Sequence, residues 1–172
     1  MDCIARYDSP LGPMLLAADG DGLTGAWFEG QKYFPDGLAA AARQERTDIL
    51  DAACAWLDCY FAGQEPGFTP PLHLEGSPFR LAVWAILRTI PYGQTVTYGS
   101  IAAQLSARTG QRMTAQAVGG AVGRNPVSII VPCHRVVGAK GALTGYAGGL
   151  ERKLRLLELE GVDTAGFTLP PV

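Results

Sequence analysis

Cys133 and His134 stand side by side in the stretch SIIVPCHRVVG, which covers residues 128–138. A cysteine is a useful nucleophile only as the thiolate, and its unperturbed pKa near ~8.5 means that ionisation at neutral pH needs a base, a cation or a dipole close by. His134 is a candidate base and Arg135 a candidate cation. Because neighbouring side chains of an extended chain point to opposite faces, either the backbone turns here or another group bridges the pair.

An imidazole base also needs an acceptor on its far nitrogen, normally a carboxylate. Acidic residues are scarce after residue 77, and the candidates are Glu151, Glu158, Glu160 and Asp163. Spacing alone does not choose among them. The alternative interpretation is a buried cysteine with an incidental histidine neighbour. The position of the pair between an apolar run and a glycine-rich segment favours a functional site.

The other cysteines, Cys3, Cys54 and Cys59, form no C-x-x-C pair, and their spacing fits no zinc signature. Cys54 and Cys59 share one amphipathic segment and are interpreted as small buried hydrophobic residues. The first residues lack a basic region followed by an apolar one, and no apolar run approaches the ~20 residues that span a bilayer. A cytoplasmic or nuclear location follows, in which thiols stay reduced, and we expect a cytoplasmic protein with no membrane partner.

Charge is divided unevenly along the 172 residues. Residues 1–77 contain 4 Lys and Arg against 12 Asp and Glu, whereas residues 78–172 contain 10 against 4. The halves therefore carry net charges of −8 and +6, which the overall −2 conceals. A basic half is typical of a surface that binds a polyanion such as nucleic acid, although chance imbalance on a solvated surface gives the same count.

The acidic half predicts a small α/β domain over residues 1–77. Short apolar runs separated by DSPLG and DGDG predict three strands, at Cys3–Tyr7, Met14–Ala18 and Leu23–Phe28. A helix is expected from about Asp48 to Phe61. The stretch GQEPGFTPPLHLEGSP that follows is typical of a linker or an edge segment. Because it coincides with the change of charge, we place the domain boundary between residues 77 and 78.

The basic half, residues 78–172, predicts helices followed by mixed structure. Ser77 and Thr97 are good capping residues, and SARTGQRM is typical of a polar loop. The three predicted helices run from Pro78 to near Pro91, from Tyr98 to about Leu105, and from about Thr114 to Val122. Two short helices with a tight connection are typical of a helix-turn-helix, although such pairs also form simply to build a core.

The third predicted helix contains the adjacent glycines Gly119 and Gly120. Each glycine costs roughly 1 kcal/mol in a helix interior, so the pair indicates close approach of a neighbouring helix or of a ligand such as a DNA groove. The run VSIIV, residues 127–131, is a candidate buried strand. Residues 150–161 predict a closing helix that ends at Gly161.

The segments PCHRVVG, NPVSIIV and LTGYAGGLERK together closely resemble the O6-alkylguanine-DNA alkyltransferase family, also called methylated-DNA–protein-cysteine methyltransferases. The resemblance covers about residues 78–161, including FRLAVWAILRTIPYGQTVTYGSIA, and PCHRV in this setting is a highly specific signature. It implies an α+β fold. A small N-terminal α/β domain, ribonuclease H-like, would precede a mostly helical C-terminal domain with a winged helix-turn-helix.

The resemblance also implies a DNA repair enzyme that works once. Cys133 would take the methyl or alkyl group from O6 of a flipped guanine, with His134 acting through water as the base and Glu160 orienting it. No cofactor is implied, and the partner is double-stranded DNA containing O6-alkylguanine, bound by a monomer. Whether O4-methylthymine is also a substrate stays open.

Further positions match the family's DNA-contacting residues. Tyr98 would press on the DNA backbone and donate to the departing guanine, while Asn125 would hold the turn before the active-site segment. Tyr146 and the backbone of Ala147 would wall the flipped base, and carbonyls near Cys133 and Val136 would accept from its amine. The complete expected set is Tyr98, Gln116, Asn125, Arg135, Val136, Tyr146 and Ala147.

Two departures from the family pattern carry expectations of their own. Gln116 stands where members usually have an arginine that fills the gap left by the flipped base, so we expect weaker lesion capture. Some members bind zinc in the N-terminal domain through cysteines and histidines. Here Asp19 and Thr24 stand at such positions, leaving only Cys3 and His73, so no metal is expected.

Two alternative functions follow from the same residues. One is a sensor or regulator that recognises alkylated DNA with weak or no transfer because of Gln116. The other is a cysteine hydrolase, which is disfavoured because no oxyanion hole is legible in the sequence.

Overall fold

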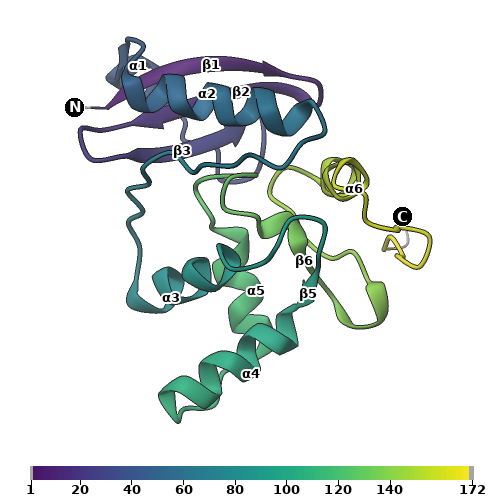
Figure 1. The fold of residues 1–172 in the computed structure, drawn as a ribbon. Coiled ribbons are helices and arrows are strands. Elements are labelled where there is room, and N and C mark those ends of the chain that lie inside the picture. Colours follow the sequence, from purple (N-terminus) through teal and green to yellow (C-terminus); the bar gives the residue numbers. More distant parts are fainter. Residues whose placement is uncertain (1, 171–172) are drawn as a thin grey trace. The chain divides into compact units, whose positions relative to one another are not determined.

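Four strands form the sheet at the start of the chain in the computed structural model, which describes residues 2–170 (Figure 1). Its order is β3-β2-β1-β4, with β1, β2 and β3 antiparallel and the short β4 parallel to β1. The strands are β1 (Cys3–Ser9), β2 (Gly12–Ala18), β3 (Leu23–Phe28) and β4 (Arg43–Gln44). The three predicted strands are therefore confirmed, with two of them extended toward their shared turn.

A long helix lies on one face of this sheet, and a small apolar cluster lies on the other. Helix α2 (Asp48–Phe61) begins at Thr47, whose hydroxyl accepts from the Leu50 N–H, and it lies along one face (Figure 1). Tyr7 fixes that contact, because its hydroxyl donates to Asp58 at 2.6 Å. On the opposite face Ile4, Leu15 and Ala17 are buried. Partly buried residues pack on them, one of which, Leu38, begins the short helix α1 (Leu38–Ala41): Trp27, Phe34, Leu38 and Ala42.

The proline-rich stretch after α2 is an edge segment of the same unit. The Leu23 N–H donates to the Pro71 carbonyl at 2.7 Å, and the His73 N–H donates to the Leu23 carbonyl at 2.9 Å. Gly22 permits this approach, since a Cβ there would lie 2.7 Å from the Leu72 carbonyl carbon. The chain thus divides into a first unit, up to Glu75 together with Pro126–Ile130, and a second unit, Gly76–Asn125 together with the residues from Val131.

The predicted strand over residues 127–131 is wrong. Val127 makes an isolated parallel bridge with Ala26, and the chain then turns. Ile129 adopts φ +71°, a left-handed conformation that no strand contains and that β-branched residues rarely adopt. Residues 127–131 are all buried. Their apolar composition is therefore explained by burial and not by a place in a sheet.

The second unit is mainly helical. Its helices are α3 (Pro78–Leu87), α4 (Tyr98–Thr109), α5 (Ala115–Gly123) and α6 (Leu150–Leu159). Ser77, Thr97 and Thr114 cap the first three, as their types favour. The indole N–H of Trp84 donates to the Ala121 carbonyl at 2.8 Å and ties α3 to α5. The mixed α+β class of the chain is therefore as predicted.

Helices α4 and α5 form the expected helix-turn-helix, but α4 runs one turn further than the predicted end near Leu105. It stops at Gly110, whose φ of +71° closes the helix. The Thr109 hydroxyl donates back to the Leu105 carbonyl at 2.8 Å, so the polar residues of this turn are compatible with helix. The connection is therefore shorter than the loop SARTGQRM suggested.

Two very short strands complete the second unit. Strands β5 (Val96–Thr97) and β6 (Val136–Val137) pair in parallel and lie side by side in Figure 1. This pairing brings the start of α4 next to the residues that follow Cys133. Two single 3-10 turns, η1 (Cys133–Arg135) and η2 (Ala139–Gly141), flank β6. Within residues 2–170, no helix is long and apolar enough to cross a bilayer.

Gly25 is required by the sheet. A Cβ at this position would lie 1.8 Å from the Trp27 ring, which packs on the cluster around Ile4, Leu15 and Ala17. Gly25→Ala should therefore displace the indole and lower the free energy of unfolding by about 1–3 kcal/mol. Urea unfolding followed by circular dichroism measures this. Gly20→Ala is the matched control, because nothing lies within 4 Å of a Cβ there, and an equal loss in both variants would contradict the prediction.

Candidate active site

The backbone turns at Cys133, so Cys133 and His134 do not lie in an extended segment. The Cys133 N–H donates to the Val131 carbonyl at 2.8 Å, and the Arg135 N–H donates to the Pro132 carbonyl at 3.1 Å. The resulting 3-10 turn η1 contains Cys133, His134 and Arg135, and all three side chains are buried. Three residues per turn send consecutive side chains in different directions, so adjacency alone does not join the thiol to the imidazole.

Asn125 anchors the start of this turn. Its side-chain amide donates to the Val131 carbonyl at 2.8 Å, which links the end of α5 to the residue two before Cys133. Asn125 is itself buried. Because a buried amide is costly unless it is hydrogen-bonded, this contact holds the approach to Cys133 in one conformation.

The Glu160 carboxylate is the centre of the site. Glu160 is the capping residue at the end of α6, and its side chain is fully buried. One oxygen lies 2.5 Å from His134 Nε2. The other accepts from Arg135 Nε at 2.8 Å and from the Gly93 N–H at 2.9 Å. Of the four acidic residues that the sequence left open, the structure brings this one to His134.

These contacts set the charge state of the pair. Burial alone would raise the pKa of Glu160, but hydrogen bonds from His134, Arg135 and the Gly93 N–H outweigh it and hold the pKa at about 2. Burial lowers the pKa of His134, although Glu160 opposes the effect. A neutral imidazole beside a carboxylate is the state in which a histidine acts as a general base.

Arg135 has internal partners. Besides Glu160, its guanidinium donates to the Ile90 carbonyl at 2.7 Å and lies 5.6 Å from the centre of the Tyr92 ring. Its side chain is only 9% exposed. In the structure Arg135 therefore fixes Glu160 and the turn after α3.

Cys133 is also buried, at 6% exposed. Burial raises the pKa of its thiol, whereas a hydrogen bond from Asn125 and the charge of Lys153 act in the opposite direction. The thiol is thus protonated at rest, and it needs a base in order to react.

The remaining predicted residues lie at different depths. The half-buried Tyr98 begins α4, and its hydroxyl donates to the Thr144 carbonyl at 2.9 Å. Val136 is buried in β6, Tyr146 and Ala147 are half-buried in the loop before α6, and Gln116 is exposed on α5. Contact of these residues with DNA stays a prediction.

Comparison with known proteins assigns both parts of the chain. Residues 4–74 match the family described as 6-O-methylguanine DNA methyltransferase, ribonuclease-like domain, and residues 78–162 match its DNA binding domain. The chain belongs to this family. A methylated-DNA–protein-cysteine methyltransferase of Mycobacterium leprae is 48% identical over 153 residues, which cover 89% of this chain and 88% of the relative. One from Methanosarcina acetivorans is 46% identical over 160 residues, covering 91% and 97%.

Solved structures of the family agree. The O6-methylguanine methyltransferase of Mycobacterium tuberculosis superposes with a TM-score of 0.81 at 43% identity, covering 98% of this chain and 96% of that one. A structure of the OGT of Mycobacterium tuberculosis in complex with DNA gives a TM-score of 0.78 at 44% identity, covering 92% of each chain. The predicted family and fold class are thus confirmed.

Sequence reasoning missed two groups of the site. Gly93 contributes only a backbone N–H, which no side-chain pattern reveals. Lys153 is fully buried on α6. A signal for it existed, because Lys153 lies three residues after Leu150 and four before Leu157, on the apolar stripe of the helix.

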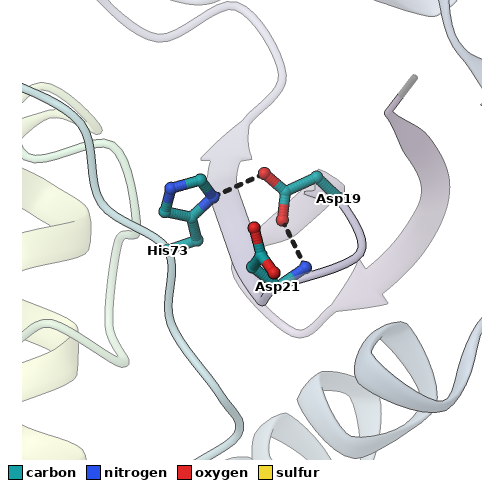
Figure 2. Close-up of side chains that lie close together, drawn as sticks. All are labelled: Asp19, Asp21 and His73. Atoms are coloured by element: carbon teal, nitrogen blue, oxygen red, sulfur yellow. Dashed lines mark hydrogen bonds and ion pairs between the residues drawn. The ribbon is translucent and has the colours of Figure 1, made fainter.

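A separate polar cluster in the first unit includes Asp19 and His73, two of the positions considered above for zinc. Asp19, Asp21 and His73 have ligand atoms within 4.8 Å of one another (Figure 2). Asp19 uses both oxygens for protein donors: one is 2.5 Å from His73 Nδ1 and the other accepts from the N–H groups of Asp21 and Gly22. This set of two carboxylates and one histidine does not match a cysteine–histidine zinc site. The expected absence of a metal stays a prediction.

Removal of the Glu160 charge should be costly in a pH-dependent way. Glu160→Gln leaves Arg135 buried without its carboxylate, so we expect a loss of about 3–5 kcal/mol in the free energy of unfolding at pH 7. The pKa of Glu160 is depressed in the folded state, so its contribution is complete above about pH 4.5 and is lost as the pH falls toward 2. Urea unfolding at pH 7 and pH 3.5 should show a smaller difference between variant and parent at pH 3.5.

The control for this prediction is Glu158→Gln, an exposed position of the same helix. It should change the free energy of unfolding little at either pH. A Glu160→Gln deficit that stays constant between the two pH values would contradict the assignment.

Proposed function

We propose that this protein repairs DNA by transferring the alkyl group of O6-alkylguanine to Sγ of its own Cys133, one group per molecule. The proposal rests chiefly on one observation. In a chain of this family, the buried Cys133 precedes a His134 whose Nε2 lies 2.5 Å from the Glu160 carboxylate. Residues 78–172 carry the reaction and the contact with DNA, and the free cysteines of the described chain suit a reducing cytoplasm.

The first step is removal of the thiol proton. Burial keeps Cys133 protonated at rest and keeps His134 neutral, which makes the imidazole the acceptor. Because consecutive side chains of a 3-10 turn diverge, the proton passes through one water molecule. Glu160 then stabilises the imidazolium that forms, as the carboxylate does in other nucleophile–histidine–acid arrangements.

The second step is displacement at carbon. The thiolate attacks the carbon bonded to O6, a C–S bond forms, and the C–O bond breaks with its electron pair moving to the guanine oxygen. The guanine takes up one proton from solvent and is restored, and the His134 imidazolium returns the thiol proton to solvent, so the protons balance. The product is a thioether, which has no leaving group of comparable quality, so each molecule acts once and no cofactor takes part.

Access to Cys133 requires that the guanine leave the helix stack, because a paired base cannot present O6 to a buried sulfur. Tyr146, the backbone of Ala147 and carbonyls of Cys133 and Val136 would line the extruded base. In the free protein the Tyr98 hydroxyl donates to the Thr144 carbonyl, so donation to guanine would require an exchange of that bond.

Helix α5 is the element that would enter the minor groove. Gln116 is exposed on it, and a Cβ at Gly120 would meet nothing within 4 Å. A helix surface of small residues can approach a narrow groove closely. The +6 charge of residues 78–172 would supply affinity that depends on salt rather than on sequence.

The alternative of a sensor without transfer is not favoured. A protein that only recognises alkylated DNA needs no ionisable thiol beside a general base, whereas this chain retains Cys133, His134 and Glu160 together. One protein molecule would bind each lesion as a monomer.

Intact mass spectrometry tests the proposal directly. After incubation with duplex DNA containing O6-methylguanine, the protein should gain the mass of one methyl group, and peptide mapping should locate it on Cys133. Cys133→Ala should gain nothing, whereas Cys54→Ala should behave like the parent. DNA binding without a mass gain would indicate a sensor, and turnover beyond one equivalent would indicate a hydrolytic cycle; either result contradicts the proposal.

Gln116 should limit lesion capture. Glutamine can hydrogen-bond the unpaired cytosine, but it brings no charge and stacks less well than arginine in the gap. Gln116→Arg should therefore raise the second-order rate of methyl transfer, by up to about tenfold if the new contact contributes ~1.4 kcal/mol. Quenched-flow transfer assays at fixed salt measure this, with the exposed Gln111→Arg as the control for added charge. Equal rates for Gln116→Arg and the parent would refute the idea.

A further inference from the structure

Lys153 is a buried cation that takes no part in the proton removal or the displacement proposed for Cys133. It lies on α6, and its relative exposure is 0%. Transfer of an ammonium group out of water is expensive, and such groups are normally paired with a carboxylate. Among residues 2–170, no carboxylate forms an ion pair with Lys153, and Glu160 pairs with His134 and Arg135 instead. Its burial therefore needs another explanation.

The ammonium of Lys153 contacts the start of α4 and the loop before α6. Its Nζ donates to the carbonyls of Gly145 at 3.2 Å and Thr144 at 3.3 Å, and lies 3.4 Å from the Tyr98 hydroxyl. The ammonium is also 5.7 Å from the centre of the Tyr98 ring. Since Tyr98 itself donates to Thr144, one charge holds together the start of α4 and the loop that precedes Tyr146.

Helix α6, which carries Lys153, packs against the turn η1 that contains Cys133, so the two charges interact, and the same ammonium lowers the pKa of His134. Burial lowers the pKa of Lys153 to about 8, and a Cys133 thiolate would raise it. Reciprocally, Lys153 opposes the rise that burial causes in the pKa of the thiol. The other charged groups of the site, Glu160 and Arg135, neutralise each other at 2.8 Å.

We propose that Lys153 is a positioning residue of alkyl transfer: its buried ammonium is the counter-charge of the Cys133 thiolate and fixes Tyr98 against the carbonyls of residues 144 and 145. This role rests on the proposed function. Lys153 keeps its proton throughout, because the thiol proton goes to His134 through water and the electron pair of the broken C–O bond goes to guanine. The negative charge therefore forms beside a cation that is already in place, with no reorganisation of solvent.

The pH dependence of thiol reactivity tests the proposal without DNA. A Cys133 thiolate also acts on Tyr98 of α4, and the other charged or titratable groups of the site are His134 and Arg135 of η1 and Glu160 at the end of α6. All of these stay unchanged in the variants. The rate of carbamidomethylation of Cys133 by iodoacetamide is followed from pH 6 to pH 10 by peptide mass spectrometry. Lys153→Gln keeps N–H donors but removes the charge, and it should react about tenfold more slowly at pH 7.5, with a midpoint about one unit higher.

The controls separate charge from packing. Lys153→Arg should keep the parent midpoint, and Arg155→Met, an exposed position of the same helix, should leave both rate and midpoint unchanged. Thermal unfolding verifies that each variant is folded, and Lys153→Met replaces Lys153→Gln if the amide is not tolerated. An uncharged, folded variant with the parent midpoint would overturn the proposal. Because this assay needs no lesion, failure of the parent to accept methyl groups would refute the proposed function separately.

Discussion

The ion pairs of Glu160 are the constraint on which the site depends. One carboxylate joins the turn after α3, the 3-10 turn η1 and the end of α6, which are far apart in the sequence. Burial of a carboxylate is offset here by three donors, so loss of any one leaves charge uncompensated. Gly93 is part of this arrangement, because its φ of +78° turns the chain so that its N–H meets Glu160, and a Cβ would lie 3.2 Å from the Glu160 carbonyl oxygen.

Burial also explains how a reactive cysteine can be kept for a single use. A thiol with a depressed pKa would be consumed by any passing oxidant or electrophile. Burial instead raises the pKa of Cys133, and His134, the proposed base, is buried as well. The reactivity of Cys133 thus depends on a substrate that places its alkyl carbon in the site. This condition favours selectivity for that substrate over a fast reaction with any electrophile.

Sequence patterns predicted the elements whose boundaries are chemically marked. Helix α2 was predicted with its observed bounds, because Gly63 marks its end, and the structure adds the Thr47 cap at its start. The end of α4 was missed, since the polar residues after Leu105 suit helix and loop equally. The turn at Ile129 was missed because apolar β-branched residues favour strand, and only tertiary contacts hold this one at positive φ.

Sequence patterns likewise identified some residues of the site and not others. Cys133 and His134 are visible as a dipeptide, whereas the choice of Glu160 among four acids came from family resemblance and not from spacing. Lys153 escaped prediction because lysines on surface helices are normally exposed. Its partners are mostly backbone carbonyls of a loop that no pattern places.

Helix α6 accounts for why these two charges work together. Lys153 and Glu160 are seven residues apart, which is about two turns and ~10.5 Å along the axis, so both project from nearly the same face. The leucines between them, Leu156 and Leu157, are fully buried and fix the rotation of the helix. A single element therefore carries the Lys153 ammonium and the Glu160 carboxylate that contacts His134. A shift of α6 by one residue would rotate both side chains by about 100°. We therefore expect the packing of its apolar stripe to affect alkyl transfer as well as stability.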